Sequence, residues 1–405
     1  MPDQPPPKSR RRWLQPSIRG LMVLVLIIGG GLGWVVTSAR VQREVVAGIK
    51  KANGQVGYNW EYKDDQPSYG KPWAPKWLVD RIGVDYFGDV VSVGLHERAS
   101  DAELVQVGKL RRLSELNLLG SHVTDAGLAH LEGSTGLKAL YLSKTAVGDA
   151  GLMHLTLTHL RWLSLEESEV SDAGLTQLEG ATSLEWLSLL RTGASDAGLV
   201  HLRGLTNLNE LVLEGTSVTD AGLVHLKSLT GLKKLWLSDT KVADAGLVHL
   251  KGLTRLEKLV LNNTLVSDPG LAHLEGLSRL RELDLDGTRV TDAGLAQLKG
   301  LIRLESLFLR KCQVKDAGLA DLKGLSRLRN LILDDTQISD AGLENLEGMT
   351  TLVSLGLEGI QVSDAGLEHL KALTSLRYLS LVNSQVTDAG VKELQQALPK
   401  LTIRR

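Results

Sequence analysis

The sequence predicts an α/β solenoid, a right-handed horseshoe with a parallel sheet on its concave face, preceded by one transmembrane helix. A motif of the form Asp-Ala-Gly-Leu recurs every 24 residues from Asp125 to Asp388, with one 23-residue step. A Leu-x-x-Leu-x-Leu pattern precedes the motif, and an uncharged run fills residues 20–39. About twelve full repeats in register indicate one elongated array over 90–405, because a solenoid grows by stacking units and does not divide into separate cores.

The N-terminal elements are predicted to be a basic tail and a membrane span. Residues 1–19 form a short tail rich in arginine, and the uncharged run of residues 20–39 follows. Twenty residues at helical rise span about 30 Å, the thickness of a bilayer core, so we interpret the run as a transmembrane signal anchor. The basic tail favours a cytoplasmic N-terminus with the repeats outside the cytoplasm. A cleaved signal peptide is the alternative, because Thr37-Ser38-Ala39 is a small-residue site.

Residues 40–89 are predicted to form a juxtamembrane helix and an aromatic cap. Apolar spacing indicates a helix over 41–52, alternation indicates a strand over 55–62, and a short helix is expected over 77–82. The stretch is rich in Trp and Tyr, which we interpret as cover for the open end of the leucine core; a ligand site is the alternative. Terminal strands of the array are expected near 90–95 and 398–403.

Each repeat is predicted to contain a strand, a turn and a helical return. The Leu-x-Leu step has the period of a strand, whereas Asp-Ala-Gly-Leu-x-x-Leu places leucines three apart, as on a short helix. The Ser or Thr before the aspartate is expected to cap that helix, and the aspartate suits the positive end of its dipole. One unit cannot bury its leucines alone, so stacked neighbours must supply a continuous core.

The full pattern, Leu-x-x-Leu-x-Leu-x-x-Thr-x-Val-[Ser/Thr]-Asp-Ala-Gly-Leu-x-x-Leu, resembles that of the leucine-rich repeat family over roughly residues 90 to 403. The Val-Thr-Asp-Ala-Gly-Leu segment is similar to the subfamily of F-box leucine-rich proteins and many bacterial repeat proteins. With the basic tail and the hydrophobic run, the chain resembles membrane-anchored repeat proteins of planctomycete-type bacteria. That resemblance implies a location more than an activity. Cys312 is the only cysteine and occupies the ninth, buried position of its repeat, which excludes an intramolecular disulfide and a cysteine zinc cluster.

Aromatic residues on the predicted strands are the first candidates for a binding surface. Residues between the strand leucines point out of the concave face, and the aromatic residues at such positions include Tyr141, Trp162, Trp186 and Trp236. Adjacent strands lie about 4.8 Å apart, so the rings are expected to form one exposed apolar patch. Such clusters are favoured as interface anchors. The alternative is that the rings only stabilise the sheet as cross-strand neighbours.

Charged residues beside the rings are the second group of candidates. Glu214, Lys234 and Lys258 are predicted to contribute to partner binding next to the aromatic patch. Further along, three carboxylates alternate on one strand, at Glu282, Asp284 and Asp286, which raises the question of a calcium site. They are spread over about 13 Å of strand, so we interpret them as a charge pattern that selects a partner.

The sequence excludes several other classes of function. The formal net charge of -1 gives no reason to expect nucleic-acid binding. Seven histidines share one helix position on helices spaced roughly 8 to 10 Å apart, which is too far to share a metal ion. There is no glycine-rich phosphate loop, no His-Glu-x-x-His and no Gly-x-Ser-x-Gly, so we expect neither catalysis nor a cofactor.

The predicted function is therefore a non-enzymatic, membrane-anchored scaffold for protein–protein interaction that binds a protein partner on its concave face. One alternative is carbohydrate or cell-envelope polymer binding, in which the same rings stack on sugars. Another is an intracellular substrate adaptor of the F-box type, although the chain lacks an F-box-like helical segment.

Overall fold

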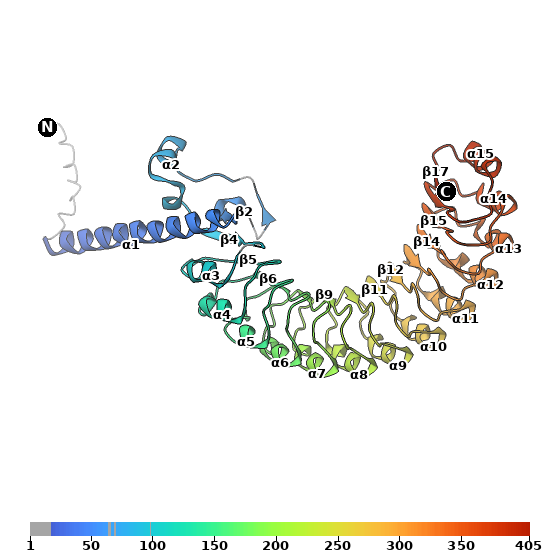
Figure 1. Ribbon diagram of the computed structural model, residues 1–405, viewed down its shortest axis with the longest axis horizontal. Coiled ribbons are helices and arrows are strands. Elements are labelled where there is room, and N and C mark those ends of the chain that lie inside the picture. The colour runs from blue at the N-terminus through green and yellow to red at the C-terminus, as the bar shows by residue number, and fades with distance from the viewer. Residues whose placement is uncertain (1–17, 64–65, 69, 98) are drawn as a thin grey trace, which may run out of the picture.

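A computed structural model describes residues 18–405 apart from 64–65, 69 and 98, and excludes the side chains of residues 18–24, 26–28, 63 and 66–67. The described strands form one fifteen-stranded sheet and a separate two-stranded hairpin. Within the large sheet, β1 is antiparallel to β4, and the strands from β4 to β17 follow chain order and run parallel. Figure 1 shows a curved array with the strands on its inner side and the short helices on its outer side.

The N-terminal part of the structure is α1 (Ile18–Lys51), β1 (Gln55–Tyr58), η1 (Asn59–Glu61), the hairpin β2 (Tyr62–Lys63) and β3 (Gln66–Pro67), α2 (Lys76–Ile82) and η2 (Val84–Tyr86).

The sheet continues with β4 (Val90–Gly94), β5 (Glu115–Asn117), β6 (Ala139–Tyr141), β7 (Trp162–Ser164), β8 (Trp186–Ser188), β9 (Glu210–Val212), β10 (Lys234–Trp236), β11 (Lys258–Val260), β12 (Glu282–Asp284), β13 (Ser306–Phe308), β14 (Asn330–Ile332), β15 (Ser354–Gly356), β16 (Tyr378–Ser380) and β17 (Thr402–Arg404). The helices between them are α3 (Asp101–Val107), α4 (Asp125–Leu128), α5 (Asp149–Leu152), α6 (Asp172–Leu175), α7 (Asp196–Leu199), α8 (Asp220–Leu223), α9 (Asp244–Leu247), α10 (Asp268–Leu271), α11 (Asp292–Leu295), α12 (Asp316–Leu319), α13 (Asp340–Leu343), α14 (Asp364–Leu370) and α15 (Asp388–Ala397). In most repeats a short 3-10 turn extends the helix, as η9 (Ala296–Gly300) extends α11.

The first helix differs from the sequence prediction. The expected span over 20–39 and the expected helix over 41–52 are one continuous helix, α1, because nothing in the backbone stops it before Lys51. Its C-terminal part packs on the array through Val45, Val46 and Ile49, which are buried. Part of the predicted span lies outside the described side chains, and within the part searched no helix is long and apolar enough to cross a membrane.

The cap region confirms most of the predicted elements and shortens one. The helix expected over 77–82 is α2, and the strand expected near 90–95 is β4. The strand expected near 398–403 is reduced to β17, which begins at Thr402 because α15 continues to Ala397. The strand expected over 55–62 ends at Tyr58, because the Glu61 carboxylate accepts a hydrogen bond from the Tyr58 amide at 2.8 Å and closes a 3-10 turn. Tyr58 stacks on Trp60 with ring centroids 4.8 Å apart, which supports the interpretation of this region as a cap.

The repeats share one continuous leucine core. In a central repeat, Leu208, Leu211, Leu213, Leu223 and Leu226 all have 0% exposure. The sheet register places leucine beside leucine from strand to strand, as at Leu211 and Leu235. Each unit therefore buries its apolar surface against its neighbours, as a solenoid requires.

The recurring aspartate joins neighbouring repeats. Asp196 accepts a hydrogen bond from the Thr219 amide at 2.7 Å and another from the Thr219 hydroxyl at 2.6 Å. The cap bond predicted from the sequence also exists, but it is long, at 3.3 Å from the Ala221 amide to the Thr219 hydroxyl. The same pair of hydrogen bonds joins Asp101 to Thr124, Asp149 to Ser171, Asp172 to Ser195, Asp244 to Ser267, Asp268 to Thr291, Asp316 to Ser339, Asp340 to Ser363 and Asp364 to Thr387. The main role of the aspartate is thus to link neighbouring repeats, and we call this pair of hydrogen bonds the staple. Hydrogen bonds to a charged carboxylate are stronger than those between neutral groups.

The motif glycine makes room for this staple. A Cβ atom at Gly222 would overlap the Asp196 carboxylate and would lie 3.1 Å from a methyl group of Leu199. The equivalent glycines of the neighbouring repeats meet the preceding aspartate in the same way. The glycine is therefore required by the approach of the next repeat, although it costs helix propensity.

Candidate binding surface on the concave face

The concave face is built from rows of equivalent strand residues. In each strand from β5 to β16, we call the first residue the first row and the third residue the third row; the residue between them is a buried leucine. Residues two apart on a strand point to the same side, so both rows face the inside of the curve. Beyond each strand, the chain turns through a left-handed residue, for example Asp239 with φ 54° and Lys311 with φ 60°.

The predicted aromatic patch is divided between the two rows. Trp162 and Trp186 are register partners in the first row of β7 and β8. Tyr141 lies in the third row of β6, beside Ser164. Trp236 lies in the third row of β10, two strands beyond Trp186. The four rings therefore lie in two rows, since alternate positions on a strand are roughly 6.6 Å apart along it, and one continuous apolar patch stays a prediction.

Trp236 is the centre of a mixed apolar and cationic group. Its register partners are the half-buried Val212 and the buried Val260, which flank the ring with apolar side chains. The ammonium nitrogens of Lys234 and Lys258 lie 6.0 Å and 5.5 Å from its ring centroid. A cation at this distance from a tryptophan ring is attracted by the negative ring face. The structure thus brings three of the predicted site residues together.

Glu210 connects this group to Trp186. The indole nitrogen of Trp186 donates a hydrogen bond to the Glu210 carboxylate at 3.1 Å, and Lys234 forms an ion pair with Glu210 at 3.1 Å. On the other side, Lys258 pairs with Glu282 at 2.7 Å. We call the set Trp186, Glu210, Lys234, Trp236, Lys258 and Glu282 the concave network. It crosses five strands, from β8 to β12.

Val212 and the partners of Glu210 were not predicted from the sequence. The signal that could have found them is the repeat itself, since Glu210 is 24 residues after Trp186 and 24 before Lys234. Equivalent positions of neighbouring repeats are adjacent in space, so the intermediate strand must contribute its own residue. Alignment by row would have shown both.

The other predicted candidates lie around the network. Arg161 covers the ring of Trp162, with its guanidinium carbon 4.4 Å from the centroid. Tyr141 is half-buried, and burial raises the pKa of its hydroxyl. Glu214 follows β9, where burial and then the charge of Asp239 raise the pKa of its carboxyl. In the described residues no ion pair links Glu214 to either network lysine.

The acidic group on β12 forms hydrogen bonds within the protein. Asp284 accepts from the Asp286 amide at 3.0 Å, and Asp286 accepts from the Arg310 amide at 2.6 Å. The Arg310 guanidinium pairs with Asp334 at 3.2 Å. Burial raises the pKa of Asp286 to about 6, with Asp284 and Asp334 as further causes. These carboxylates therefore hold turns and neighbouring strands, and among the described side chains no group is arranged to hold a metal ion.

The comparisons with known proteins support the leucine-rich repeat family. A family model for the leucine-rich repeat matches residues 372–394. An internalin from Listeria monocytogenes is similar in structure, with a TM-score of 0.63 and 25% identity over 81% of this chain and 92% of the internalin. A leucine-rich repeat protein from Leptospira interrogans has a TM-score of 0.56 and 17% identity over 74% of this chain and 80% of its own. None of the curated proteins searched by sequence matches the chain.

The fold is thus that of a leucine-rich repeat solenoid, whose members generally mediate protein–protein interaction. Its parallel sheet leaves the concave surface open to a partner (Figure 1).

Proposed function

We propose that the chain is a non-enzymatic, membrane-anchored scaffold that binds a protein partner on its concave face. The observation that supports this most is the concave network, in which two half-exposed tryptophans are fixed by paired charges from adjacent strands. Rigid aromatic side chains bury a large area on binding and lose little entropy, so they serve as interface anchors. The surrounding ion pairs select a partner of complementary charge.

The geometry favours a protein over a carbohydrate as the partner of this surface. A sugar that stacks on tryptophan needs an uncovered ring face, whereas cations lie over Trp162 and Trp236. The same cations suit the carboxylates of an acidic protein surface, which can exchange with Glu210 and Glu282 as ion-pair partners. Val212, which is half-buried beside Trp236, adds apolar area that a protein interface can bury.

The proposed anchor is the N-terminal half of α1. Figure 1 shows this half extending beyond the array. Its described apolar side chains have no partner in the core and are exposed, with Val25 at 62%, Leu32 at 61% and Trp34 at 54%. An exposed apolar stretch of this kind suits lipid, and Trp34 near its end suits the interface. The basic residues before it favour a cytoplasmic N-terminus. Protease added to intact cells should then digest the repeats, and protection of the repeats would contradict this orientation.

The test of binding is capture by the full-length protein after cross-linking in its native cells. The double variant Trp186→Ala with Trp236→Ala should lose the protein species that the wild type captures. Tyr378→Ala is the matched control, because Tyr378 is also a first-row aromatic and is 61% exposed, but it lies far from the network. Retention of the captured protein by the double variant would refute the proposal. Recovery of a carbohydrate polymer in place of a protein would favour the alternative.

A further inference from the structure

A row of arginines follows the edge at which the strands begin. Arg255, Arg279, Arg303 and Arg327 occupy the same position in four successive repeats, three residues before the strand begins, and all four are exposed. Three further arginines, Arg281, Arg329 and Arg377, lie two residues after this position in their own repeats. We call these seven residues the arginine edge.

The charge of the arginine edge is largely uncompensated. Among the described side chains, one ion pair on this edge joins Arg281 to Glu305 at 3.4 Å, and the structure shows none for Arg303, Arg327 or Arg329. The whole chain has a formal net charge of -1, so this concentration of cations is local. It is also separate from the concave network, which lies on the strands themselves.

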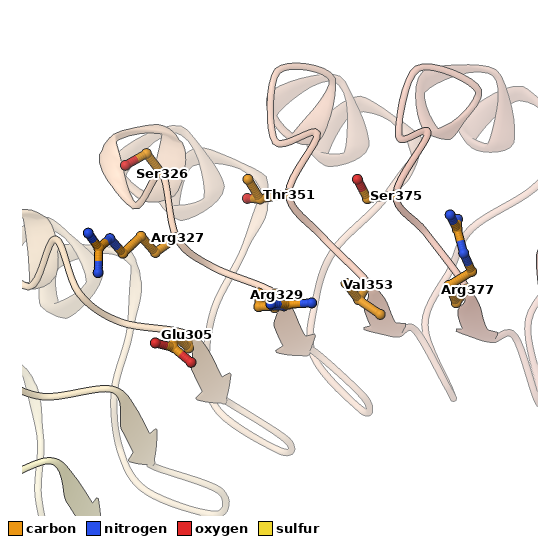
Figure 2. Close-up of a pocket in the computed structure, with 8 residues that line it drawn as sticks. All are labelled: Glu305, Ser326, Arg327, Arg329, Thr351, Val353, Ser375 and Arg377. Carbon is orange, nitrogen blue, oxygen red and sulfur yellow. The ribbon is translucent and has the colours of Figure 1, made fainter.

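A pocket of about 590 Å³ opens on this edge where the row is interrupted. Val353 replaces the charged residue of its repeat, so a gap opens between Arg329 and Arg377. Figure 2 shows Arg329, Val353 and Arg377 at the starts of three successive strands, with three hydroxyl side chains on the segments that lead to them. The hydroxyls belong to Ser326, Thr351 and Ser375, and Glu305 and Arg327 complete the lining.

We infer that the arginine edge binds an acidic polysaccharide whose carboxylates pair with successive guanidiniums. Guanidinium groups bind carboxylates in a bidentate manner, and the repeats present one such group at each step of roughly 4.8 Å, the spacing of adjacent strands. The hydroxyls of the pocket can hydrogen-bond to sugar hydroxyls, and Val353 can contact the apolar face of a sugar ring. The polymer would enter the pocket with one residue and extend along Arg327, Arg303 and Arg279.

Other polyanions fit this edge less well. A single-stranded nucleic acid would need aromatic side chains on which its bases stack, and none lines the pocket. Inorganic polyphosphate has no apolar face, so it leaves Val353 without a role.

The experiment measures binding of polygalacturonate to the full-length protein at about 0.15 M salt, the physiological ionic strength. The triple variant of Arg303, Arg327 and Arg329 to Ser should bind at least tenfold more weakly than the wild type. The control replaces Lys241, Arg289 and Lys311 with Ser, which removes the same charge from exposed positions elsewhere and should change affinity less than twofold. Equal weakening by both variants, or no binding by the wild type, would overturn the inference. So would tighter binding of polyphosphate or of a single-stranded oligonucleotide than of polygalacturonate.

A second measurement needs only the wild-type protein. An arginine-specific reagent, phenylglyoxal, should modify Arg303 and Arg327 in the free protein, and polygalacturonate should protect them while leaving Arg289 reactive. Mass spectrometry of peptides measures this directly. Equal protection of Arg289, or no protection of the edge, would contradict the proposed site.

Discussion

Replacement of the motif glycine by alanine should destabilise the array, although helix propensity alone predicts the opposite. In one repeat, a Cβ atom at Gly294 would overlap the Asp268 carboxylate and lie 3.0 Å from a methyl group of Val290. Asp268 accepts hydrogen bonds from Thr291 at 2.7 Å and 2.6 Å, and its displacement would weaken both.

The expected size of the effect follows from these contacts. Hydrogen bonds to a charged group contribute about 1.5–3 kcal/mol each, and overpacking costs about 1–3 kcal/mol. The gain in helix propensity from Gly to Ala is about 1 kcal/mol. With partial relaxation, we expect Gly294→Ala to lower the free energy of unfolding by about 2–4 kcal/mol, since the losses exceed the gain.

Gly300→Ala in the same repeat is the matched control. A Cβ atom there would lie 3.5 Å from a side-chain carbon of Glu275, an ordinary contact, so stability should stay equal or rise slightly. Urea unfolding followed by circular dichroism compares the two variants, and hydrogen exchange shows whether the loss is centred on the staple between Asp268 and Thr291. A Gly294→Ala protein as stable as Gly300→Ala would refute the claim that the motif glycine makes room for the aspartate of the preceding repeat.

Three further predictions concern the staple, the turns and the acidic group. Ala243→Ser should raise the free energy of unfolding by about 0.5–1.5 kcal/mol, because Asp220 accepts only the amide of residue 243 and a hydroxyl would add a second bond; no gain in urea unfolding would count against the staple. Lys311→Gly should stabilise the fold by about 1 kcal/mol in the same assay, because residue 311 has φ 60°, a conformation that costs other residues about 1–2 kcal/mol; a loss of stability would contradict this. Burial raises the folded pKa of Asp286 to about 6, so the wild type should lose stability as the pH rises from about 4, the unfolded pKa, to 6. Asp286→Asn should remove that part of the pH dependence of Tm, and an identical Tm profile for the two proteins would show that Asp286 is not its source.

The repeat pattern predicts the architecture well because each leucine has the same environment in every unit. The positions of Leu211, Leu213 and Leu223 suffice to place a strand and a short helix, and the structure buries all three. The role of Asp196 could not be deduced in this way. Its partner Thr219 lies 23 residues away, and local helix-capping rules assign Asp196 to the start of α7 and Thr219 to the cap of the next helix, α8.

The functional surface was predictable only in part for a similar reason. Aromatic residues are conspicuous in a chain with few of them, so Trp186 and Trp236 could be singled out. Their separation into two rows depends on which strand residue each one occupies, which requires the register. The arginine edge lies before the strands, where no hydrophobic periodicity within one repeat marks the exposed residues. Only the stacking of repeats brings Arg303 beside its equivalents.

The central claim is that a protein partner binds the concave face, and site-specific photo-cross-linking in the native cells tests it most directly. A cross-linking amino acid at Val212, which lies beside Trp236 of the concave network, should yield a discrete adduct with one protein. The same amino acid at Met153, which is 67% exposed on the outer side, should yield none. An adduct from residue 153 but not from residue 212 would contradict the account.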